Sequence, residues 1–361
     1  MMTYADARWE NCIAHRGEEA ESFLTKFFGE KRRSILLVGG AGFDPRALEV
    51  PRRLAAVAGE RVTAIFLRER RPDPRKAFLE RADRNVQCLL EAVRGAKVLD
   101  IQIFASDLAV IGGREAARLA GQIDFHPLTD VVVDASALSR GVVFPLVRVL
   151  LDRAPEACNL HLVVTDEPKT DEAIITVGCE RATTVHGFKG TLGQESYANA
   201  AVLWLPQLVP GQTSVLGQIY NAIQPSPHDV CPILPFPAAD QRAVDSLLVE
   251  YRVQLGAWEV DPRDVVYAHE SDPLDLYRTI LRMDSGRKRI FQETGSSQIV
   301  LSPVGSKVLS FGALMAAIER DFPVMYVEAV DYKIDEHSVG SQGGRGEIVH
   351  LWLKGEAYAT N

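Results

Sequence analysis

The chain has 361 residues, a formal net charge of −8 at pH 7, and 47% hydrophobic and 24% charged residues. This composition is that of a folded globular protein, and the negative charge argues against a broad nucleic-acid-binding surface. The apolar runs are too short to span a bilayer, and the five scattered cysteines form no CxxC pair. We therefore expect a cytoplasmic protein with reduced thiols, no membrane association and no metal site, long enough for two domains.

Strands and helices alternate through the first half of the chain, after a short amphipathic helix at 18–29. Continuous Val, Ile and Leu runs predict strands at 35–40, 62–69, 97–104, 131–134 and 160–165. The segments between them predict helices at 45–58, 74–93, 114–123 and 141–153. Apolar runs separated by helices are typical of a parallel sheet covered on both faces. We predict a Rossmann-like lobe at 31–168, preceded by an N-terminal helical segment at 1–30.

The alternation stops between residues 169 and 199, a glycine-containing stretch that we interpret as an irregular connection. It resumes with strands predicted at 200–206, 231–236, 265–270, 298–302 and 323–330, and helices at 213–223, 240–255, 274–291 and 306–320. The segments YVEAVDYKI and EIVHLWLKG alternate like paired antiparallel strands. The predicted fold class is therefore α/β: two Rossmann-like lobes with mainly parallel sheets, the second at 200–361 with a C-terminal β-hairpin.

The loop after the first strand contains Gly39, Gly40 and Gly42, followed by Asp44-Pro45-Arg46. Glycines at this position let the backbone turn tightly and approach a phosphate, with Arg46 beside it. The loop completes neither the P-loop nor the GxGxxG pattern. Asp-Pro is also a good helix start, so capping alone is the competing interpretation.

The second strand ends in Arg68-Glu69-Arg70-Arg71. In a dinucleotide-binding fold, an acid at this edge holds a ribose, a role that Glu69 fits, and an arginine favours an added phosphate. A solvated charged loop is the alternative.

The fourth strand of each predicted lobe ends in a polar loop that opens directly into a helix. In the first lobe, Asp134 and Ser136 are followed by Ser139 and Arg140. A cation at a helix start opposes the helix dipole, which is unfavourable unless an anion is present. We interpret Asp134, Ser136 and Arg140 as ligand-binding residues, although helix capping by the serines is also open.

The equivalent loop of the second lobe contains Ser302, Gly305, Ser306 and Lys307. The lysine again opposes the helix dipole, and the glycine permits a close backbone approach. Both halves place a cation at the start of the helix that follows the fourth strand. We therefore predict that Ser302, Ser306 and Lys307 bind the ligand from the second lobe, across a cleft from Arg140. A capped helix with a surface lysine is the alternative.

Signals for catalysis are few. The histidines form no HExxH pair, and there is no GxSxG nucleophile motif. Asp134 and His186 are the candidate acid–base groups, and the sequence assigns no partner to either.

At Asp134-Ala-Ser-Ala-Leu-Ser-Arg140 and Ser302-Pro-Val-Gly-Ser-Lys307 the chain resembles the CARF-type Rossmann-like domains of prokaryotic immunity. The resemblance implies a ligand-loop role for Asp134, Ser136, Arg140, Ser306 and Lys307, and a nucleotide second messenger as ligand. The chain lacks the Gly-Thr-Lys run of that family.

The sequence thus predicts a two-lobed protein that binds a phosphorylated, nucleotide-like ligand and acts as a sensor or scaffold, in a role that the resemblance places in antiviral defence. One alternative is an enzyme that processes nucleotides or transfers phosphoryl groups. Another is a non-catalytic assembly subunit that meets a partner through its C-terminal hairpin. We expect a homo-oligomer or a subunit of a complex.

Overall fold

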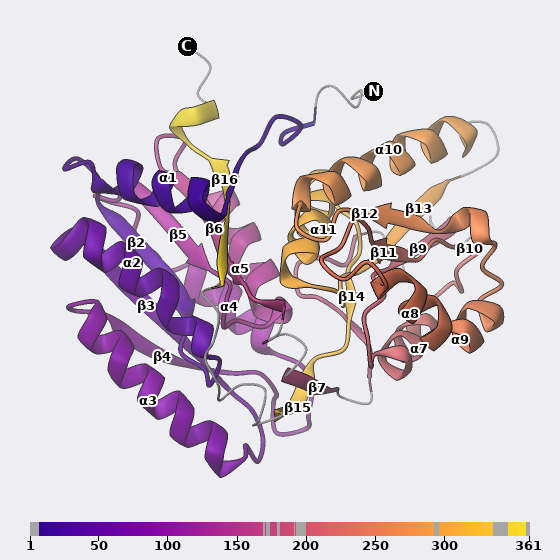
Figure 1. Ribbon diagram of the computed structural model, residues 1–361, viewed down its shortest axis with the longest axis horizontal. Helices are drawn as coiled ribbons and strands as arrows, with labels where there is room; N and C mark the ends of the chain where they lie inside the picture. The colour runs from indigo at the N-terminus through magenta and orange to yellow at the C-terminus, as the bar shows by residue number, and fades with distance from the viewer. Residues whose placement is uncertain are drawn as a thin grey trace. The chain divides into compact units, whose positions relative to one another are not determined.

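The computed structural model describes residues 7–168, 170, 174–178, 181–190, 192, 200–291, 296–334 and 346–358 (Figure 1). The chain divides into two compact units: unit 1 comprises Met1–Asn11 and Ile175–Tyr332, and unit 2 comprises Cys12–Ile174 and Lys333–Asn361. The fold class is α/β with mainly parallel sheets, as the sequence predicts. Most of the connection predicted at 169–199 lies outside the described residues.

Unit 2 contains a seven-stranded sheet in the order β1–β16–β6–β5–β2–β3–β4. The strands are β1 (Ile13–Arg16), β2 (Ile35–Gly40), β3 (Val62–Arg70), β4 (Lys97–Gln102), β5 (Asp130–Asp134), β6 (Asn159–Asp166) and β16 (Glu347–Lys354). Neighbours from β4 to β6 are parallel, whereas β16 is antiparallel to both β6 and β1. The strands β2 and β5 are buried along their whole length, which explains their continuous apolar runs.

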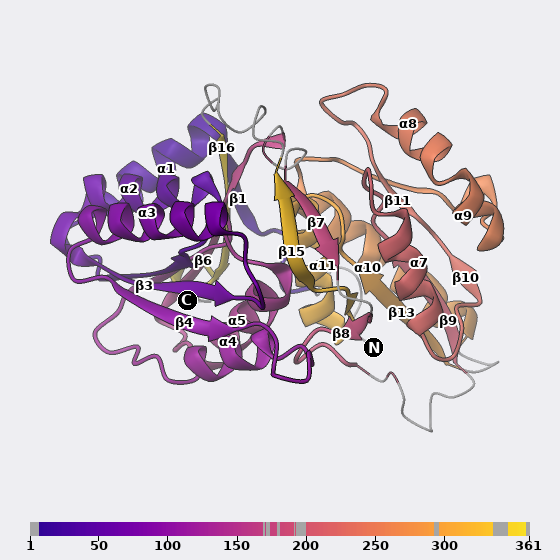
Figure 2. The ribbon, with the colours of Figure 1, turned by 90° about the horizontal axis from the view of Figure 1, so that it is seen from below.

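Helices cover both faces of this sheet. Figure 2 shows α1 (Gly17–Gly29), α2 (Glu49–Ala58) and α3 (Lys76–Ala92) on one face, and α4 (Gly112–Ala120) and α5 (Arg140–Arg153) on the other. The short helices are η2 (Pro45–Leu48), η3 (Gly59–Arg61) and η6 (Glu356–Tyr358). Under α1 to α3 lies a core that includes Phe28, Leu37, Leu54, Phe66 and Leu89. Each of these side chains comes from an apolar position on a helix face or an alternate strand position.

Unit 1 is built around parallel strands β10–β9–β13 and a parallel pair β11–β12. Its strands are β8 (Thr183–Thr184), β9 (Ala201–Pro206), β10 (Asp229–Val230), β11 (Ile233–Pro235), β12 (Val266–Ala268), β13 (Ser297–Ser302) and β14 (Met325–Tyr326). Single parallel bridges join Gln207 to Ile233 and Leu301 to Val324. These bridges place β11 beside β9 and β14 beside β13.

The helices of unit 1 are α7 (Thr213–Ala222), α8 (Ala243–Glu250), α9 (Arg252–Ala257), α10 (Pro273–Phe291) and α11 (Lys307–Arg320), with the short helix η5 (Pro262–Asp264). Figure 1 shows α10 and α11 on the opposite side of the sheet from α7 and α8. Side chains of Val202, Trp204 and Val300 join the core on the α7–α9 side. The intervening Leu203 and Leu205, also buried, face the other side, as strand alternation requires.

The two units share one strand order. Counting parallel strands along each unit, the third, second, first, fourth and fifth are neighbours: β4–β3–β2–β5–β6 in unit 2, and β12–β11–β9–β13–β14 in unit 1. In each unit the order reverses between the first and fourth strands. Loops after those strands lie at the edge where open α/β sheets bind ligands.

The predicted boundaries are wrong at both ends of the chain. The C-terminal strand β16, predicted within the second lobe, is inserted between β6 and β1 of unit 2. The strand β15 (Ala329–Ile334) pairs with β7 (Ile174–Gly178), so β15 and β16 lie in different sheets and not in a hairpin with each other. At the other end, Trp9 is buried in unit 1 against Tyr277, whereas β1 and α1 belong to unit 2.

The burial of β16 fits a central position in the sheet. Six consecutive residues from Ile348 to Leu353 are buried. A strand is buried to this extent only when it has neighbouring strands on both edges and other elements covering both faces. An alternating pattern in the sequence does not distinguish such a central strand from one arm of a hairpin.

Among the described residues, none of the helices combines the length and the apolar character that crossing a lipid bilayer requires.

Truncating a β16 side chain tests its central place. Leu351 is 0% exposed, and Leu90 of α3, in the same unit, is 44% exposed. We expect Leu351→Ala to lower the free energy of unfolding by about 3 kcal/mol, because it removes buried methyl groups and leaves a cavity. Leu90→Ala should cost less than about 1 kcal/mol. Urea denaturation measures both, and equal effects would contradict the central position of β16.

Candidate functional site

The candidate site of unit 2 lies where the loops after β2 and β5 leave the sheet. Gly39 of β2 is paired in register with Asp134 of β5, so the two loops start side by side. A Cβ atom added to Gly40 would lie 2.5 Å from the carbonyl oxygen of Ala137. Gly40 is therefore needed for the approach of the β5 loop. At Gly42 the nearest atom to an added Cβ would be that same oxygen, at 3.8 Å, so this position has room for a side chain.

Asp44 and Arg46 form a closed pair in the loop after β2. Asp44 caps η2 by accepting the backbone N–H of Arg46 at 3.0 Å. The guanidinium of Arg46 returns to the same carboxylate, with Nε 3.0 Å from Oδ1 and Nη2 2.8 Å from Oδ2. Arg46 is 3% exposed. Its predicted ligand role thus competes with a structural one, and the capping interpretation of Asp44 is confirmed.

Asp134 and Ser136 hold the β5 loop in place. Oδ1 of Asp134 accepts the backbone N–H of Ser136 at 3.0 Å and its hydroxyl at 2.5 Å. The hydroxyl oxygen of Ser136 accepts the backbone N–H of Thr165, on β6, at 2.9 Å. Both Asp134 and Ser136 are at most 1% exposed. The two predicted site residues are therefore brought together, and they connect the β5 loop to β6.

The acid at the end of β3 binds the start of α5. Oε1 of Glu69 accepts the backbone N–H of Ser139 at 2.7 Å, and Oε2 lies 2.8 Å from Nη2 of Arg71. Arg68 and Arg70 form ion pairs with Asp83 and Asp100. Glu69 thus stabilises the loop before α5. The sequence predicted a different role for this carboxylate, namely to hold a ribose.

Ser139 is the N-cap residue of α5, and its side chain makes no capping hydrogen bond. The residue is 9% exposed, and its hydroxyl has no hydrogen-bond partner among the described residues. Arg140 follows as the first residue of the helix, and no acidic residue lies in the first turn. This end of α5 has features of an anion-binding helix terminus, and the carboxylate of Glu69 already accepts the N–H of its N-cap residue.

In unit 1 the predicted residues after β13 also have structural partners. The hydroxyl of Ser302 accepts the indole N–H of Trp204 at 2.8 Å. Ser306 caps α11 by accepting the backbone N–H of Leu309 at 3.1 Å, as the capping alternative predicts. A Cβ added to Gly305 would lie 2.8 Å from Oε1 of Gln207. Lys307 is half-buried at the first position of α11.

The catalytic candidates Asp134 and His186 belong to different units. His186 is exposed in a turn after β8 of unit 1, whereas Asp134 is buried in unit 2. No group of His, Cys, Asp and Glu side chains with the arrangement of a metal site occurs within the described part of the chain.

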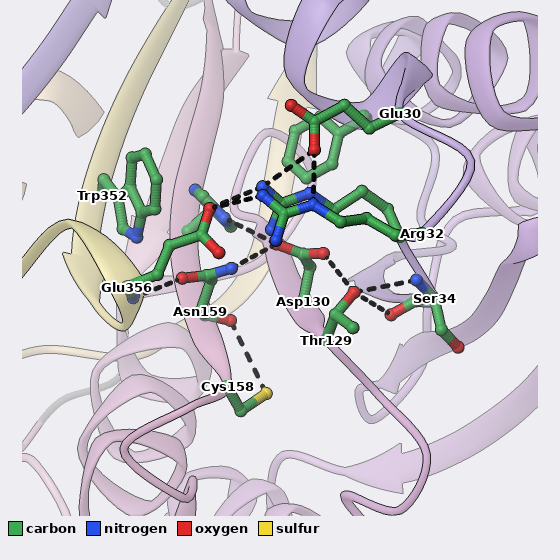
Figure 3. Close-up of polar contacts among 12 residues, drawn as sticks. Glu30, Arg32, Ser34, Thr129, Asp130, Cys158, Asn159, Trp352 and Glu356 are labelled. Atoms are coloured by element: carbon green, nitrogen blue, oxygen red, sulfur yellow. Dashed lines mark hydrogen bonds and ion pairs between the residues drawn. The ribbon is translucent and has the colours of Figure 1, made fainter. Parts of the chain in front are cut away.

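A second polar cluster, which the sequence reasoning missed, lies at the opposite edge of the unit 2 sheet (Figure 3). It consists of Arg33, Thr129, Asp130, Asn159 and Glu356, and we call it the Asp130 cluster. The carboxylate of Asp130 accepts hydrogen bonds from Thr129 at 2.5 Å and Asn159 at 2.8 Å, and Nη1 of Arg33 lies 3.5 Å from it. Arg33 also pairs with Glu356 at 2.5 Å.

Burial by itself would raise the pKa of Asp130. Hydrogen bonds from His161, Thr129 and Asn159 outweigh burial and lower that pKa overall, so the carboxyl is ionised at neutral pH. The sequence contained two signals for this region: Asp130 directly before the all-valine strand core, and His161, which hydrogen-bonds to Asp130, inside the next apolar strand.

Comparisons with known proteins do not assign the chain to a family. No family model matches it, and no curated protein does. A Pseudomonas aeruginosa UCBPP-PA14 protein assigned as a universal stress protein is 12% identical, with 83% of this chain and 95% of that chain covered and a TM-score of 0.25. A Galdieria sulphuraria protein assigned as a sarcosine dimethylglycine methyltransferase is 12% identical, with 93% and 85% covered and a TM-score of 0.26. Scores this low give no information on function.

Gly40 and Gly42 test how closely the loops after β2 and β5 pack against each other. We expect Gly40→Ala to destabilise unit 2 by about 1–3 kcal/mol, because the new methyl group meets a backbone carbonyl that cannot move freely. Gly42→Ala should change the free energy of unfolding by less than about 1 kcal/mol, since the position is open. Thermal unfolding of both variants measures the difference, and a harmless Gly40→Ala would show that the loops do not pack as described.

The buried Asp44–Arg46 pair has an exposed copy in the same chain. Asp261 and Arg263 make the same bidentate contact around Pro262, with the Arg263 side chain 88% exposed. Arg46→Ala should lower the free energy of unfolding by about 3 kcal/mol, because it leaves a buried carboxylate without its cation. Arg263→Ala should behave as the wild type. Chemical denaturation compares the two, and matching stabilities would show that Arg46 is not structural.

Proposed function

We propose that the protein binds a phosphorylated, nucleotide-like ligand at the edge of the unit 2 sheet where α5 begins, and acts as a sensor or scaffold. The observation that carries this proposal is the hydroxyl of Ser139, buried at a helix N-terminus without a partner among the described residues. A buried hydroxyl without a hydrogen bond costs about 1–3 kcal/mol. A ligand oxygen that contacts this hydroxyl removes that cost.

Two features at this position support an anion: the positive end of the α5 dipole and Arg140 as the first residue of the helix. The carboxylate of Glu69 is an acid at the same helix start, where it accepts the backbone N–H of Ser139. Strand order adds support, since β2 and β5 are the pair between which the sheet order reverses. The α11 terminus of unit 1, with Lys307, occupies the equivalent position after its own fourth strand.

The resemblance to CARF-type domains extends the proposal to a nucleotide second messenger and a role in prokaryotic antiviral defence. It also agrees with the expectation of an oligomer or a complex with another protein. The enzyme alternative has less support, because Asp134 is engaged by Ser136 and His186 lies exposed in the other unit.

A second candidate function is that of an assembly subunit without a small-molecule ligand. It is favoured by the structural partners of the predicted ligand residues: Arg46 with Asp44, Asp134 with Ser136, and Ser302 with Trp204. On this view, the polar loops serve to hold the sheet edges and the surface contacts a protein.

Ser139→Ala distinguishes the two functions. The variant removes an unsatisfied buried hydroxyl, so the ligand-free protein should gain about 1 kcal/mol of stability. A binding role predicts that the same variant loses stabilisation by nucleotides, which for the wild type amounts to about 2.7 kcal/mol at a ligand concentration 100 times Kd. Thermal shift measurements with ATP, cyclic tetra-adenylate and inorganic phosphate provide the readout.

Arg140→Ala should also lower the nucleotide-dependent increase in unfolding temperature. Arg153→Ala is the control variant. Arg153 is an exposed arginine in the last turn of the same helix, so it changes net charge equally but lies far from the helix start. Equal shifts in the two variants would reject the α5 site. No shift with any nucleotide, even for the wild type, would favour the assembly subunit.

The convergence of Arg140 and Lys307 on one ligand stays a prediction. A double-mutant cycle of Arg140→Ala and Lys307→Ala tests it through the nucleotide-dependent shift. A shared ligand predicts that the two losses are not additive, whereas separate sites predict simple addition.

A further inference from the structure

Three histidines on neighbouring strands of unit 2 form a hydrogen-bonded chain. His15 of β1 is paired in register with His350 of β16, and their Nδ1 atoms are 3.0 Å apart. Nε2 of His350 lies 2.9 Å from Nδ1 of His161, on β6. Nε2 of His161 lies 3.4 Å from Oδ1 of Asp130. The chain therefore runs across three strands and ends at the Asp130 cluster.

The chain connects the surface to the interior. His161 and His350 are both 0% exposed, whereas His15 is half-buried. His15 lines an open groove of about 730 Å³ along α1, together with Phe23 and Phe27. Phe23 stacks on both His15 and His350, at centroid distances of 4.5 and 4.4 Å. The histidines thus pack directly under α1.

The geometry dictates the proton positions. An ionised Asp130 only accepts hydrogen bonds, so Nε2 of His161 carries a proton and its Nδ1 is an acceptor. Nε2 of His350 must then donate to that atom, and Nδ1 of His350 accepts from Nδ1 of His15. All three rings are neutral in this arrangement. Nε2 of His15 is the ring nitrogen not used by the chain, and it lies at the outer end.

The surroundings oppose a positive charge at the inner end and tolerate one at the outer end. Arg33 already faces Asp130 and His161, with Glu356 and Glu30 as its other partners. Burial lowers the pKa of His161, although Asp130 opposes the change, and burial with the two neighbouring histidines lowers the pKa of His350 well below 6.5. Burial also lowers the pKa of His15, against the attraction of Glu19. The charged groups lining the groove beside His15 are Glu18, Glu19, Lys26 and Glu30.

We propose that this histidine chain is an acid-sensitive latch that holds β1, β16 and α1 together. At neutral pH the three neutral rings connect the strands and support α1. A proton from solvent enters at Nε2 of His15. His15 then gives its Nδ1 proton to His350, which gives its Nε2 proton to His161. This transfer reverses both His–His hydrogen bonds, keeps the one from His161 to Asp130, and would place the positive charge on His161. Burial and Arg33 oppose a charge there, so the latched state disfavours the uptake of this proton.

In the open state the rings are solvated and bind protons, so acidification favours opening. Because the folded-state pKa values are lowered, the stabilisation is complete above about pH 6.5 and is lost as the pH falls below that value. With three such histidines, the ratio of latched to open molecules should fall by up to about 100-fold between pH 6.5 and 5.5, the limit for a latched state that binds none of the three protons. The segment released first is β1 with α1.

Histidine tautomers in the intact ¹⁵N-labelled protein test the latch directly. We expect long-range ¹H–¹⁵N spectra at pH 8 to show His161 and His350 protonated at Nε2 and His15 protonated at Nδ1. On lowering the pH to 5.5, the amide protection factors of residues 13–29, which correct for the intrinsic pH dependence of exchange, should fall before those of β2 and β5. A different tautomer at His350, or titration of His161 and His350 near pH 6.5, would overturn the proposal.

A matched pair of variants adds a second readout. His15→Gln keeps a donor toward His350 but cannot take up a proton, so the fall in stability between pH 6.5 and 5.5 should be smaller, by up to about fivefold in the folding equilibrium. His126→Gln is the control, because His126 is exposed in the same unit and outside the chain. Identical pH profiles for the two variants would contradict the entry of the proton at His15. Should His15→Gln fail to fold, the wild-type spectra decide the question.

Discussion

The antiparallel insertion of β16 between β6 and β1 is the constraint on which unit 2 depends. It joins the last described strand of the chain to a sheet that is otherwise made by residues 13–166. The same strand carries His350, the middle member of the histidine chain, and leads into Glu356, which pairs with Arg33. The pairing of β16 in the sheet therefore also positions Glu356 against the buried Arg33 at the amino edge.

Buried polar residues lie at both edges of this sheet. At the carboxyl edge, Asp134 and Ser136 hold one loop, and the hydroxyl of Ser139 is buried without a partner among the described residues. At the amino edge, Asp130 accepts hydrogen bonds from Thr129 and Asn159, and Nε of Arg33 in the same cluster is buried without a partner among the described residues. Each edge of the sheet therefore combines satisfied buried polar groups with an unsatisfied one.

Much of the fold was predictable from the sequence because burial on both faces leaves a continuous apolar run. On this basis the predicted bounds of β2, β5 and β9 agree with the structure to within one residue. The place of β16 was not predictable, since alternation along a strand gives no information on its neighbours. For the candidate site, the positions of Asp134 and Ser136 followed from the strand ends, but the pairing of Arg46 with Asp44 depends on a side-chain conformation. The histidine chain links residues 15, 161 and 350, and its existence depends on a strand order that local patterns do not encode.

The discontinuity of unit 2 has a consequence for protein synthesis. Domains generally fold as they leave the ribosome, N-terminal parts first. The parallel strands β2 to β6 emerge early, but the outer edge of β6 has no partner until residues 347–354 have been translated. An open strand edge is a template for pairing with other chains. The whole of residues 175–332, which form most of unit 1, is translated in that interval, so the edge of β6 stays open to other strands for the synthesis of nearly half the chain.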